Sequence, residues 1–325
     1  MTEFVFPLLR FLADNRFHSF DEIRNELGLS PSEVSRALAY LAIDGIEAEE
    51  VERRGCRLTT PFSALDAAEV GRLLGENANM FAIDVVDQTG STNDDLMLRS
   101  RQGAPAGLVR VAETQTAGRG RRQRNWYSAP GGALTFSLLW AFDSGARALS
   151  GLPLAVGVSL VRSLHALKLQ GVQLKWPNDL LWQQRKVGGV LIETSGSAQG
   201  GVNAVIGVGL NLRLTRHVVE RIDQPAADLE SAGLRVGRNQ LLARLLLDLR
   251  DVLGTFSREG FSALRSEWER LHAYRDRMVR LDMAGETCLE GRVIGVDEYG
   301  ALLLETGSGI RAFHSGELSL RLAGS

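Results

Sequence analysis

The chain has 325 residues, a formal net charge of −2 and two cysteines. That length is sufficient for one to three domains with buried cores, and the near-neutral charge excludes a chain that binds polyanions over its whole surface. Cys56 and Cys288 are far apart and form no CxxC motif, which indicates a reduced protein without a disulfide framework. The sequence shows neither a basic signal peptide nor an uncharged stretch typical of a membrane span, so we expect a cytoplasmic location.

Residues 1–62 have the pattern of a winged helix-turn-helix, a DNA-binding module. A first helix is predicted from the apolar residues at helical spacing that open the chain. A second helix begins with the capping-box pair Ser19 and Glu22, and a third begins with the same pair, Ser30 and Glu33. A short helix, a glycine turn and a capped helix form the unit whose second helix enters a DNA major groove.

The side chains expected to face DNA lie on the third helix and on a basic hairpin at 53–58. On the helix, Val34, Ala37, Leu38 and Leu41 are predicted to form the buried face, so the opposite face would be exposed. The hairpin would act as a wing that meets phosphates. The predicted DNA contacts are Ser32, Ser35, Arg36, Arg53, Arg54 and Arg57.

The charge of this segment leaves an alternative open. Residues 1–60 hold seven arginines, no lysine and eleven acidic residues, and seven cations against eleven anions leave a charge of −4. DNA binding depends on the neutralisation of phosphates, so an acidic module must gather its few cations on one face. The alternative is a winged helix that serves for protein contacts or domain packing.

A set of small polar residues follows at the start of a later helix. A linker and a short helix over 66–74 come first. A strand predicted at 83–86 then leads to Ser91, Thr92 and Asn93, which stand at the start of the later helix. Residues of these types at a helix start usually act as caps. The functional interpretation is that the same hydroxyls and amide bind a ligand that needs both donors and acceptors.

The stretch 115–126, which reads QTAGRGRRQRNW, is called the arginine loop below. It connects two apolar strands, predicted at 108–112 and 133–139, and holds four arginines within six residues. Glycine permits tight turns and close approach, and arginine offers a planar fork for phosphate and carboxylate oxygens. We interpret this loop as a clamp for a polyanion, with a solvated basic surface loop as the alternative.

A hairpin after the predicted helix over 151–167 holds a second set of candidates. Strands are predicted at 173–175 and 180–182, and the return strand begins at Lys186. Lys186 lies seven residues after Asp179, so antiparallel pairing can bring the two side chains close. The adjacent pair Gly188 and Gly189 removes side chains where a ligand or another strand must approach.

The remaining elements are a buried strand, a long connection, two helices and a set of short strands. The buried strand is predicted at 203–210, and the polar connection 213–237 is expected to close over a ligand. Helices are predicted at 239–256 and 261–271. Five short strands separated by glycine-containing turns follow, which is typical of a small SH3-like barrel. They are predicted at 278–281, 287–296, 301–305, 310–313 and 318–320.

Four segments resemble the biotin protein ligase family, in the expected order. They are Ser91-Thr92-Asn93, GRGRRQRNW at 118–126, KWPND at 175–179 and KVGGVLIE at 186–193. The resemblance runs from about Phe6 to Leu322 and includes the helix-turn-helix, so it points to the branch of bifunctional ligase-repressors. It implies an α+β multidomain fold. The expected domains are a winged helix-turn-helix over 1–62, a mixed-sheet α/β ligase domain of the class II synthetase type over 66–272, and an SH3-like barrel over 273–325.

The resemblance also implies an activity and partners. ATP, with Mg²⁺, and biotin would give biotinyl-5′-AMP, and a lysine of a biotin carboxyl carrier protein would then take the biotin. The adenylate would also promote a homodimer that binds operator DNA and represses biotin synthesis. Lys186, Arg121 and Asp179 are the implied catalytic residues. The implied binding residues are Ser91, Thr92, Asn93, Gln115, Gly118, Arg119, Gly120, Arg121, Arg122, Trp126, Lys186, Gly188, Gly189 and Asn211.

Other nucleotide and hydrolase motifs are missing from the sequence. There is no Walker loop, no complete dinucleotide fingerprint, no GxSxG and no HExxH, and the five histidines show no metal spacing. The segment after GxGxN, which carries an adenine-packing aromatic in the family, has Ala226 and no aromatic residue here. The alternatives are a ligase without DNA binding, a transcription factor that only senses a small molecule, and a lipoate or octanoyl transferase.

Overall fold

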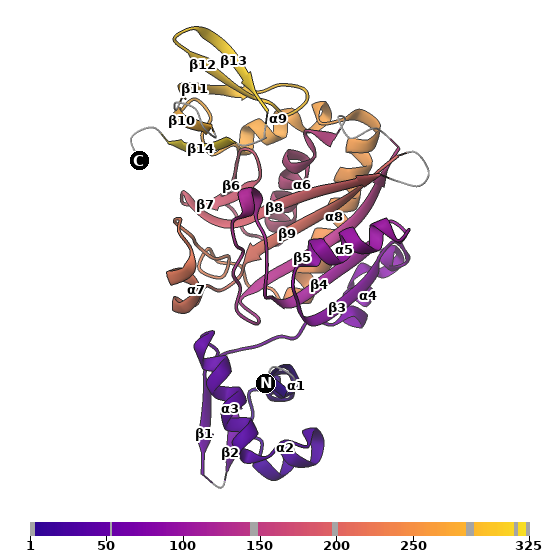
Figure 1. Cartoon of the computed structure of the whole chain (residues 1–325), viewed down its shortest axis with the longest axis vertical. Helices are drawn as coiled ribbons and strands as arrows, with labels where there is room; N and C mark the ends of the chain where they lie inside the picture. Colours follow the sequence, from indigo (N-terminus) through magenta and orange to yellow (C-terminus); the bar gives the residue numbers. More distant parts are fainter. Residues whose placement is uncertain are drawn as a thin grey trace.

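Three parts follow one another along the chain in this computed structural model (Figure 1). A small N-terminal unit of helices and a hairpin lies at one end, a large central unit lies in the middle, and a C-terminal sheet lies at the other end. No helix among the described residues is long and apolar enough to cross a membrane. The structure describes residues 4–52, 54–143, 149–196, 201–283, 289–314 and 318–322.

The N-terminal unit has its own hydrophobic core. Its elements are α1 (Val5–Phe11), α2 (Phe20–Leu27), α3 (Pro31–Ile43), β1 (Ala48–Val51) and β2 (Gly55–Leu58), with β1 and β2 paired antiparallel. Both predicted capping boxes form, at Ser19 with Glu22 and at Ser30 with Glu33. The predicted buried face of α3 is also confirmed, since all four of its apolar residues are buried. These local signals therefore determine where α2 and α3 begin.

A mixed sheet forms the centre of the molecule. Within the described residues it has seven strands in the order β3-β4-β5-β9-β8-β7-β6, and β3 and β4 are parallel while the other neighbours are antiparallel. The strands are β3 (Ala82–Thr89), β4 (Leu108–Gln115), β5 (Ala133–Phe142), β6 (Val172–Lys175), β7 (Asp179–Trp182), β8 (Arg185–Gly196) and β9 (Val202–Asn211). Each predicted strand is present, and β3, β4 and β5 each extend three residues beyond the predicted end, to Thr89, Gln115 and Phe142.

Helices cover both faces of this sheet. Leu134, Phe136 and Leu138 of β5 belong to the main core, together with α6 (Leu152–Ala166) and α8 (Arg238–Glu259). Because side chains alternate along a strand, Leu139 faces the other side, where it packs with Leu96 of α5. The remaining helices of this unit are α4 (Ala67–Leu74), α5 (Thr92–Arg101), α7 (Arg216–Arg221) and α9 (Ser262–Leu271).

Helix α7 corrects one prediction. The connection 213–237 was predicted as loop throughout, whereas six of its residues are helical. The side chain of Thr215 caps this helix by accepting a hydrogen bond from the backbone of Val218, and Val218 is buried. A short helix inside a polar connection has too few residues to produce a periodic apolar pattern, so the sequence alone did not indicate it.

The C-terminal strands pair as one antiparallel sheet. Its order among the described residues is β13-β12-β11-β10-β14. The indole of Trp176, next to the central sheet, is buried and donates to the carbonyl of Gly300, at 3.0 Å, which attaches the C-terminal sheet to the central unit. The strands are β10 (Met278–Met283), β11 (Leu289–Val296), β12 (Leu302–Thr306), β13 (Gly309–Phe313) and β14 (Leu318–Leu322). The predicted start of β11 at 287 lies outside the described residues.

Candidate active site

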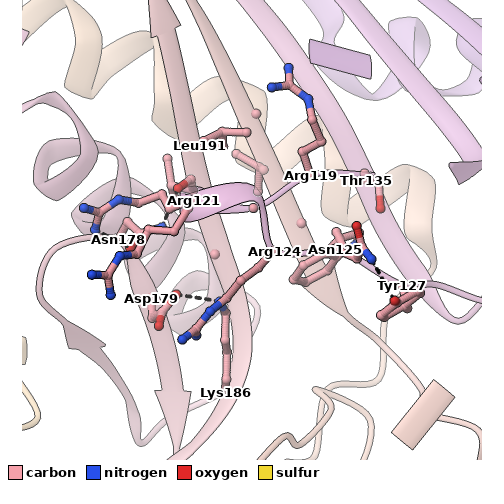
Figure 2. A pocket seen from close by; sticks show the side chains of 18 of the residues that line it. Arg119, Arg121, Arg124, Asn125, Tyr127, Thr135, Asn178, Asp179, Lys186 and Leu191 are labelled. Carbon is pink, nitrogen blue, oxygen red and sulfur yellow. Dashed lines mark hydrogen bonds and ion pairs between the residues drawn. The ribbon is translucent and has the colours of Figure 1, made fainter. Parts of the chain in front are cut away.

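A cavity of about 370 Å³ gathers the four motif segments from distant parts of the chain. Its lining comes from the start of α5, the arginine loop, strands β5 to β9, the end of α7 and Leu320 of β14. Figure 2 shows that the arginine loop lies over the same cavity as the hairpin of β7 and β8. Of the predicted binding residues, Gly118 and Gly188 do not line it. Gly188 instead lies against β9, where an added Cβ would be 2.5 Å from Leu210.

Lys186 and Asp179 form an ion pair inside the cavity. The distance from Nζ to Oδ1 is 2.7 Å, and the two side chains are 20% and 16% exposed. Gly189 lies opposite Asp179 in the β7–β8 register, and a Cβ there would be 3.3 Å from the lysine Nζ. The hairpin thus brings the predicted pair together, and the glycine leaves room for it.

A second lysine, Lys175, also lines the cavity. It belongs to the KWPND segment, but the sequence alone did not identify it as a site residue. It is the register partner of Asp179 across β6 and β7. Burial lowers the pKa of Lys175, and Asp179 opposes that effect. One carboxylate therefore lies between two lysines, which concentrates positive charge on this side of the cavity.

The small polar residues at the start of α5 line the cavity, and Ser91 also caps the helix. Ser91 caps α5 by accepting a hydrogen bond from the backbone of residue 94, and the backbone N–H of Thr92 donates to Gln115 Oε1 at 2.7 Å. Ser137 Oγ lies 2.7 Å from Thr92 Oγ1 and 2.6 Å from Asn93 Oδ1. The cap interpretation is therefore confirmed for Ser91, whereas ligand binding by these cavity-lining side chains stays a prediction.

Two glycines of β9, which the sequence interpretation did not assign to the site, let side chains approach the sheet. A Cβ on Gly209 would lie 2.7 Å from the ring of Trp126, and a Cβ on Gly207 would collide with the amide of Asn93. Trp126 therefore packs closely on β9 and forms part of the cavity wall, together with Phe136. The signal that could have identified these positions is the alternation of glycines in an otherwise apolar, buried strand.

The arginines of the loop have different partners. Arg121 Nη1 donates to Asn178 Oδ1 at 3.3 Å, and burial lowers the pKa of Arg121 while Asp179 opposes that change. Figure 2 shows Arg124 reaching toward Lys186 and Arg119 pointing away from it. Arg119 contacts carboxylates on α5 and β8, so its pKa is raised although burial acts in the opposite direction.

The connection that contains α7 closes another side of the cavity. Its backbone pairs with that of Lys186, whose N–H donates to Pro225 O at 2.9 Å and whose C=O accepts from Ala227 N–H at 2.9 Å. Ala226, between them, lines the cavity. Asn211 is buried and donates to the same two backbone regions, at 3.3 and 3.1 Å, so it supports this junction. The cavity residues of this connection are Arg221, Ile222, Asp223, Gln224 and Ala226.

Some of the residues predicted to contact DNA are exposed, whereas others already contact side chains of the N-terminal unit. Ser32 and Arg36 are exposed on α3. Ser35 donates to the carboxylate of Glu50, at 3.1 and 3.2 Å. Arg53 lies outside the described residues.

The wing arginines pack on an aromatic ring. The guanidinium groups of Arg54 and Arg57 lie over the ring of Phe17, at 3.9 and 4.7 Å from its centroid. Arg57 also donates to Glu49, at 2.8 Å. The charge of Arg57 is therefore partly neutralised by a carboxylate of the N-terminal unit itself.

The N-terminal unit contacts the central unit next to α7. A Cβ on Gly45, just after α3, would lie 2.6 Å from Thr215, the cap of α7. Burial raises the pKa of Asp44, and His217 and Arg221 act in the opposite direction. A second cavity, of about 450 Å³, lies between this unit, the arginine loop and α7. Helix α7 thus contacts the N-terminal unit on one side and the first cavity on the other.

No group of three or more His, Cys, Asp or Glu in the described part of the chain is placed to hold a metal ion. The polar groups that line the cavity include lysines, arginines, amides and hydroxyls, each of which can act on a ligand. They form two regions, with buried amides and hydroxyls around α5 at one end and lysines and arginines around Asp179 at the other. Such a cavity fits a ligand with a neutral polar head and a negatively charged tail.

The chain is similar to biotin protein ligases in sequence and in fold. Residues 85–211 match the biotin/lipoate A/B protein ligase family, and residues 276–321 match the biotin protein ligase C terminal domain. The chain is 35% identical to the bifunctional ligase/repressor BirA of Salmonella typhimurium, over 97% of both chains, and 35% identical to that of Escherichia coli over the same shares. The biotin protein ligase of Aquifex aeolicus, solved in complex with biotin and ATP, has a TM-score of 0.63 and 31% identity. That match covers 74% of this chain and 99% of the Aquifex chain.

Proposed function

Since the chain belongs to the biotin protein ligase family, we propose that it joins biotin to ATP as biotinyl-5′-AMP and then transfers biotin to a carrier lysine. The observation that carries this proposal is the ion pair of Lys186 and Asp179 opposite the arginine loop in a cavity with a polar, neutral far end. The M. tuberculosis relative, 34% identical over 73% of this chain, is named a biotin–[acetyl-CoA-carboxylase] ligase. We therefore propose the biotin carboxyl carrier protein of acetyl-CoA carboxylase as the acceptor.

The first step joins two anions. The carboxylate of biotin attacks the α-phosphorus of ATP, and pyrophosphate leaves. Lys186 would bridge the carboxylate and the α-phosphate, and cations at the position where charge develops lower such a barrier. Arg121 and Arg122 would hold the phosphates. Arg119 was also predicted to bind phosphate. Its guanidinium group contacts two carboxylates, those of Asp94 and Glu193.

The second step needs a correctly placed amine. The uncharged amine of the carrier lysine attacks the carbonyl carbon of the mixed anhydride, and AMP leaves with the bonding electron pair. Asp179 would orient the amine by accepting one of its hydrogen bonds. At the far end, Ser91, Thr92 and Asn93, with Gln115, would hold the ring of biotin through complementary donors and acceptors.

We propose that Mg²⁺ enters bound to ATP. The described residues contain no three-residue metal site, and the acidic residues that line the cavity are Asp179 and Asp223. A magnesium ion on the phosphates would offset their charge when bound. Lys186 and the loop arginines would act on the remaining charge.

The test is direct. Purified protein is incubated with ATP, Mg²⁺ and labelled biotin, first alone and then with the carrier domain. We expect biotinyl-5′-AMP in the first reaction and labelled carrier in the second. Labelled lipoate in place of biotin serves as the control, because a lipoate transferase is the alternative. Absence of the biotin adenylate, or preference for lipoate, would contradict the proposal.

We further propose that the N-terminal unit is a winged helix-turn-helix through which the protein represses biotin synthesis as an adenylate-promoted homodimer on operator DNA. Helix α7 supports this proposal, because it contacts the end of α3 through Thr215 and the ligand cavity through Arg221. A ligand that orders this connection can bias the N-terminal unit if it binds the two arrangements with different affinity. The acidic partners of Ser35 and Arg57 favour the alternative, a module for protein contacts.

Salt dependence separates these two alternatives. With Arg36 and Arg54 as the phosphate contacts, a dimer would neutralise about four phosphates, which corresponds to a slope of log K against log salt near −4. Fluorescence anisotropy with DNA upstream of biotin-synthesis genes is measured with and without biotin plus ATP. Sedimentation of the same samples reports the dimer. Binding that ignores the ligand would exclude the switch, and absence of specific binding at low salt would exclude the DNA reader.

A further inference from the structure

Glu193 lies outside the cavity lining but contacts two groups of the site. It is the last residue of the KVGGVLIE segment, on β8, and its side chain is 27% exposed. Its Oε2 accepts a hydrogen bond from Asn93 Nδ2 at 2.8 Å. Both of its carboxylate oxygens lie close to Arg119 Nη2, at 3.1 and 3.0 Å. One carboxylate thus joins the start of α5 to the arginine loop.

We propose that Glu193 is a positioning residue for the ligase reaction, which holds Asn93 in one orientation and latches the arginine loop through Arg119. The proposal rests on the biotin ligase function proposed above. It assigns Arg119 to the latch, so the phosphate-binding part of the loop begins at Arg121. Glu193 itself would touch neither biotin nor ATP.

The amide of Asn93 is held from three sides. Its Nδ2 donates to Glu193 and, at 3.4 Å, to the carbonyl of Leu191, while its Oδ1 lies 2.6 Å from Ser137 Oγ. A flip of the amide would place Oδ1 against the carboxylate, which is repulsive. The backbone of Gly207 closes the fourth side. Loss of the carboxylate would therefore free an amide that lines the ligand cavity.

Arg119 lies at the base of the loop, which is itself a small hairpin. Residue 119 pairs with Asn125, and the backbone N–H of Trp126 donates to the carbonyl of Gly118 at 2.8 Å. The tip, 121–124, extends from this base over the cavity. An anchor at the base therefore sets where the tip lies. Asp94 also pairs with Arg119, but the side chain of Asp94 is 58% exposed, against 27% for Glu193. Solvent therefore screens the Asp94–Arg119 ion pair more than the Glu193–Arg119 ion pair.

Three variants of the full-length chain separate the two contacts. Glu193→Gln keeps an acceptor for Asn93 and removes the charge that binds Arg119. Arg119→Gln removes the latch and leaves Asn93 untouched. Asp84→Asn is the matched control, because Asp84 is 33% exposed and pairs with Arg110 and Arg99 at 2.7 and 2.8 Å, away from the cavity. Thermal melts check that all three fold.

The first measurement needs no activity. Limited trypsin digestion of the ligand-free protein reports cleavage within 121–124. Glu193→Gln should speed it by about fivefold, the factor for one lost ion pair, and Arg119→Gln, which also loses the pair with Asp94, should speed it at least as much. The adenylate should leave both variants faster by a similar factor, while KM for biotin in Glu193→Gln stays close to that in Asp84→Asn. Glu193→Ala should in addition raise KM for biotin by about fivefold, through the freed amide of Asn93.

The outcomes are distinct. If trypsin cleavage and adenylate release were equally fast in Glu193→Gln and in Asp84→Asn, the proposal that Glu193 holds the arginine loop would be overturned. A KM for biotin raised in Glu193→Gln as much as in Glu193→Ala would also overturn the division of roles. Failure of the wild-type protein to form an adenylate would contradict the ligase function, whereas the trypsin result would still report whether Glu193 holds the loop.

Discussion

Replacement of Lys186 by methionine tests the charge at the centre of the proposed reaction. Methionine keeps an unbranched side chain of similar length and removes the ammonium group. Lys186 Nζ lies 2.7 Å from Asp179 Oδ1, so the variant deprives a largely buried carboxylate of its partner. Lys175, the register partner of Asp179, remains on its other side.

Two magnitudes follow from this geometry. The pair is 16–20% exposed, and Lys175 and water still solvate the carboxylate, so the free energy of unfolding should fall by about 1–3 kcal/mol, which leaves the protein folded. The reaction should suffer more. Loss of a preorganised group that stabilises developing charge costs about 3–4 kcal/mol, so the rate of adenylation should fall by about 10²–10³-fold.

The assay is single-turnover formation of labelled biotinyl-5′-AMP, with Lys168→Met as the control. The chain has three lysines, and Lys168 is the exposed one. Urea unfolding of both variants measures the structural part of the effect. An adenylation rate for Lys186→Met within a few-fold of that for Lys168→Met would refute the assignment of Lys186 as the bridging cation.

Replacement of Arg121 by glycine should release the adenylate faster, because a cation held over the cavity is lost. Mass spectrometry should then find biotin on the exposed Lys168, and an unlabelled chain would exclude Arg121 from the clamp. Gly209→Val should push the ring of Trp126 off β9 and raise the Kd for biotin by about tenfold or more. Calorimetry measures this Kd, and an unchanged value would show that the ring does not contact biotin. Burial lowers the pKa of His272 to about 3. Its neutral form stabilises the fold above pH 6.5, and this contribution is lost as the pH falls from 6.5 toward 3. Urea unfolding at pH 7 and pH 4 should therefore show a loss for the wild type larger by about 3 kcal/mol than for His272→Phe, and equal losses would contradict the argument.

Short-range signals in the sequence determined most of the elements and one central contact. The capping boxes at the starts of α2 and α3 involve residues three positions apart, and the strands follow alternating or continuous apolar runs. The pair of Lys186 and Asp179 was predictable for the same reason, because a tight antiparallel hairpin brings nearby residues together. The four motif segments could also be expected to meet, since the family resemblance covers most of the chain.

Tertiary structure decided which charged groups meet. The chain has 37 lysines and arginines and 39 acidic residues, so the sequence offered Arg119 many partners. Packing of β8 beside α5 placed Glu193 there, 74 residues away, so an ion pair joins the arginine loop to β8. Packing also placed the half-buried Lys175 beside Asp179, formed α7 inside the connection 213–237, and set Trp126 on Gly209. Local propensity acts over a few residues, whereas burial and ion pairing depend on distant segments that only the folded chain brings within a few ångströms.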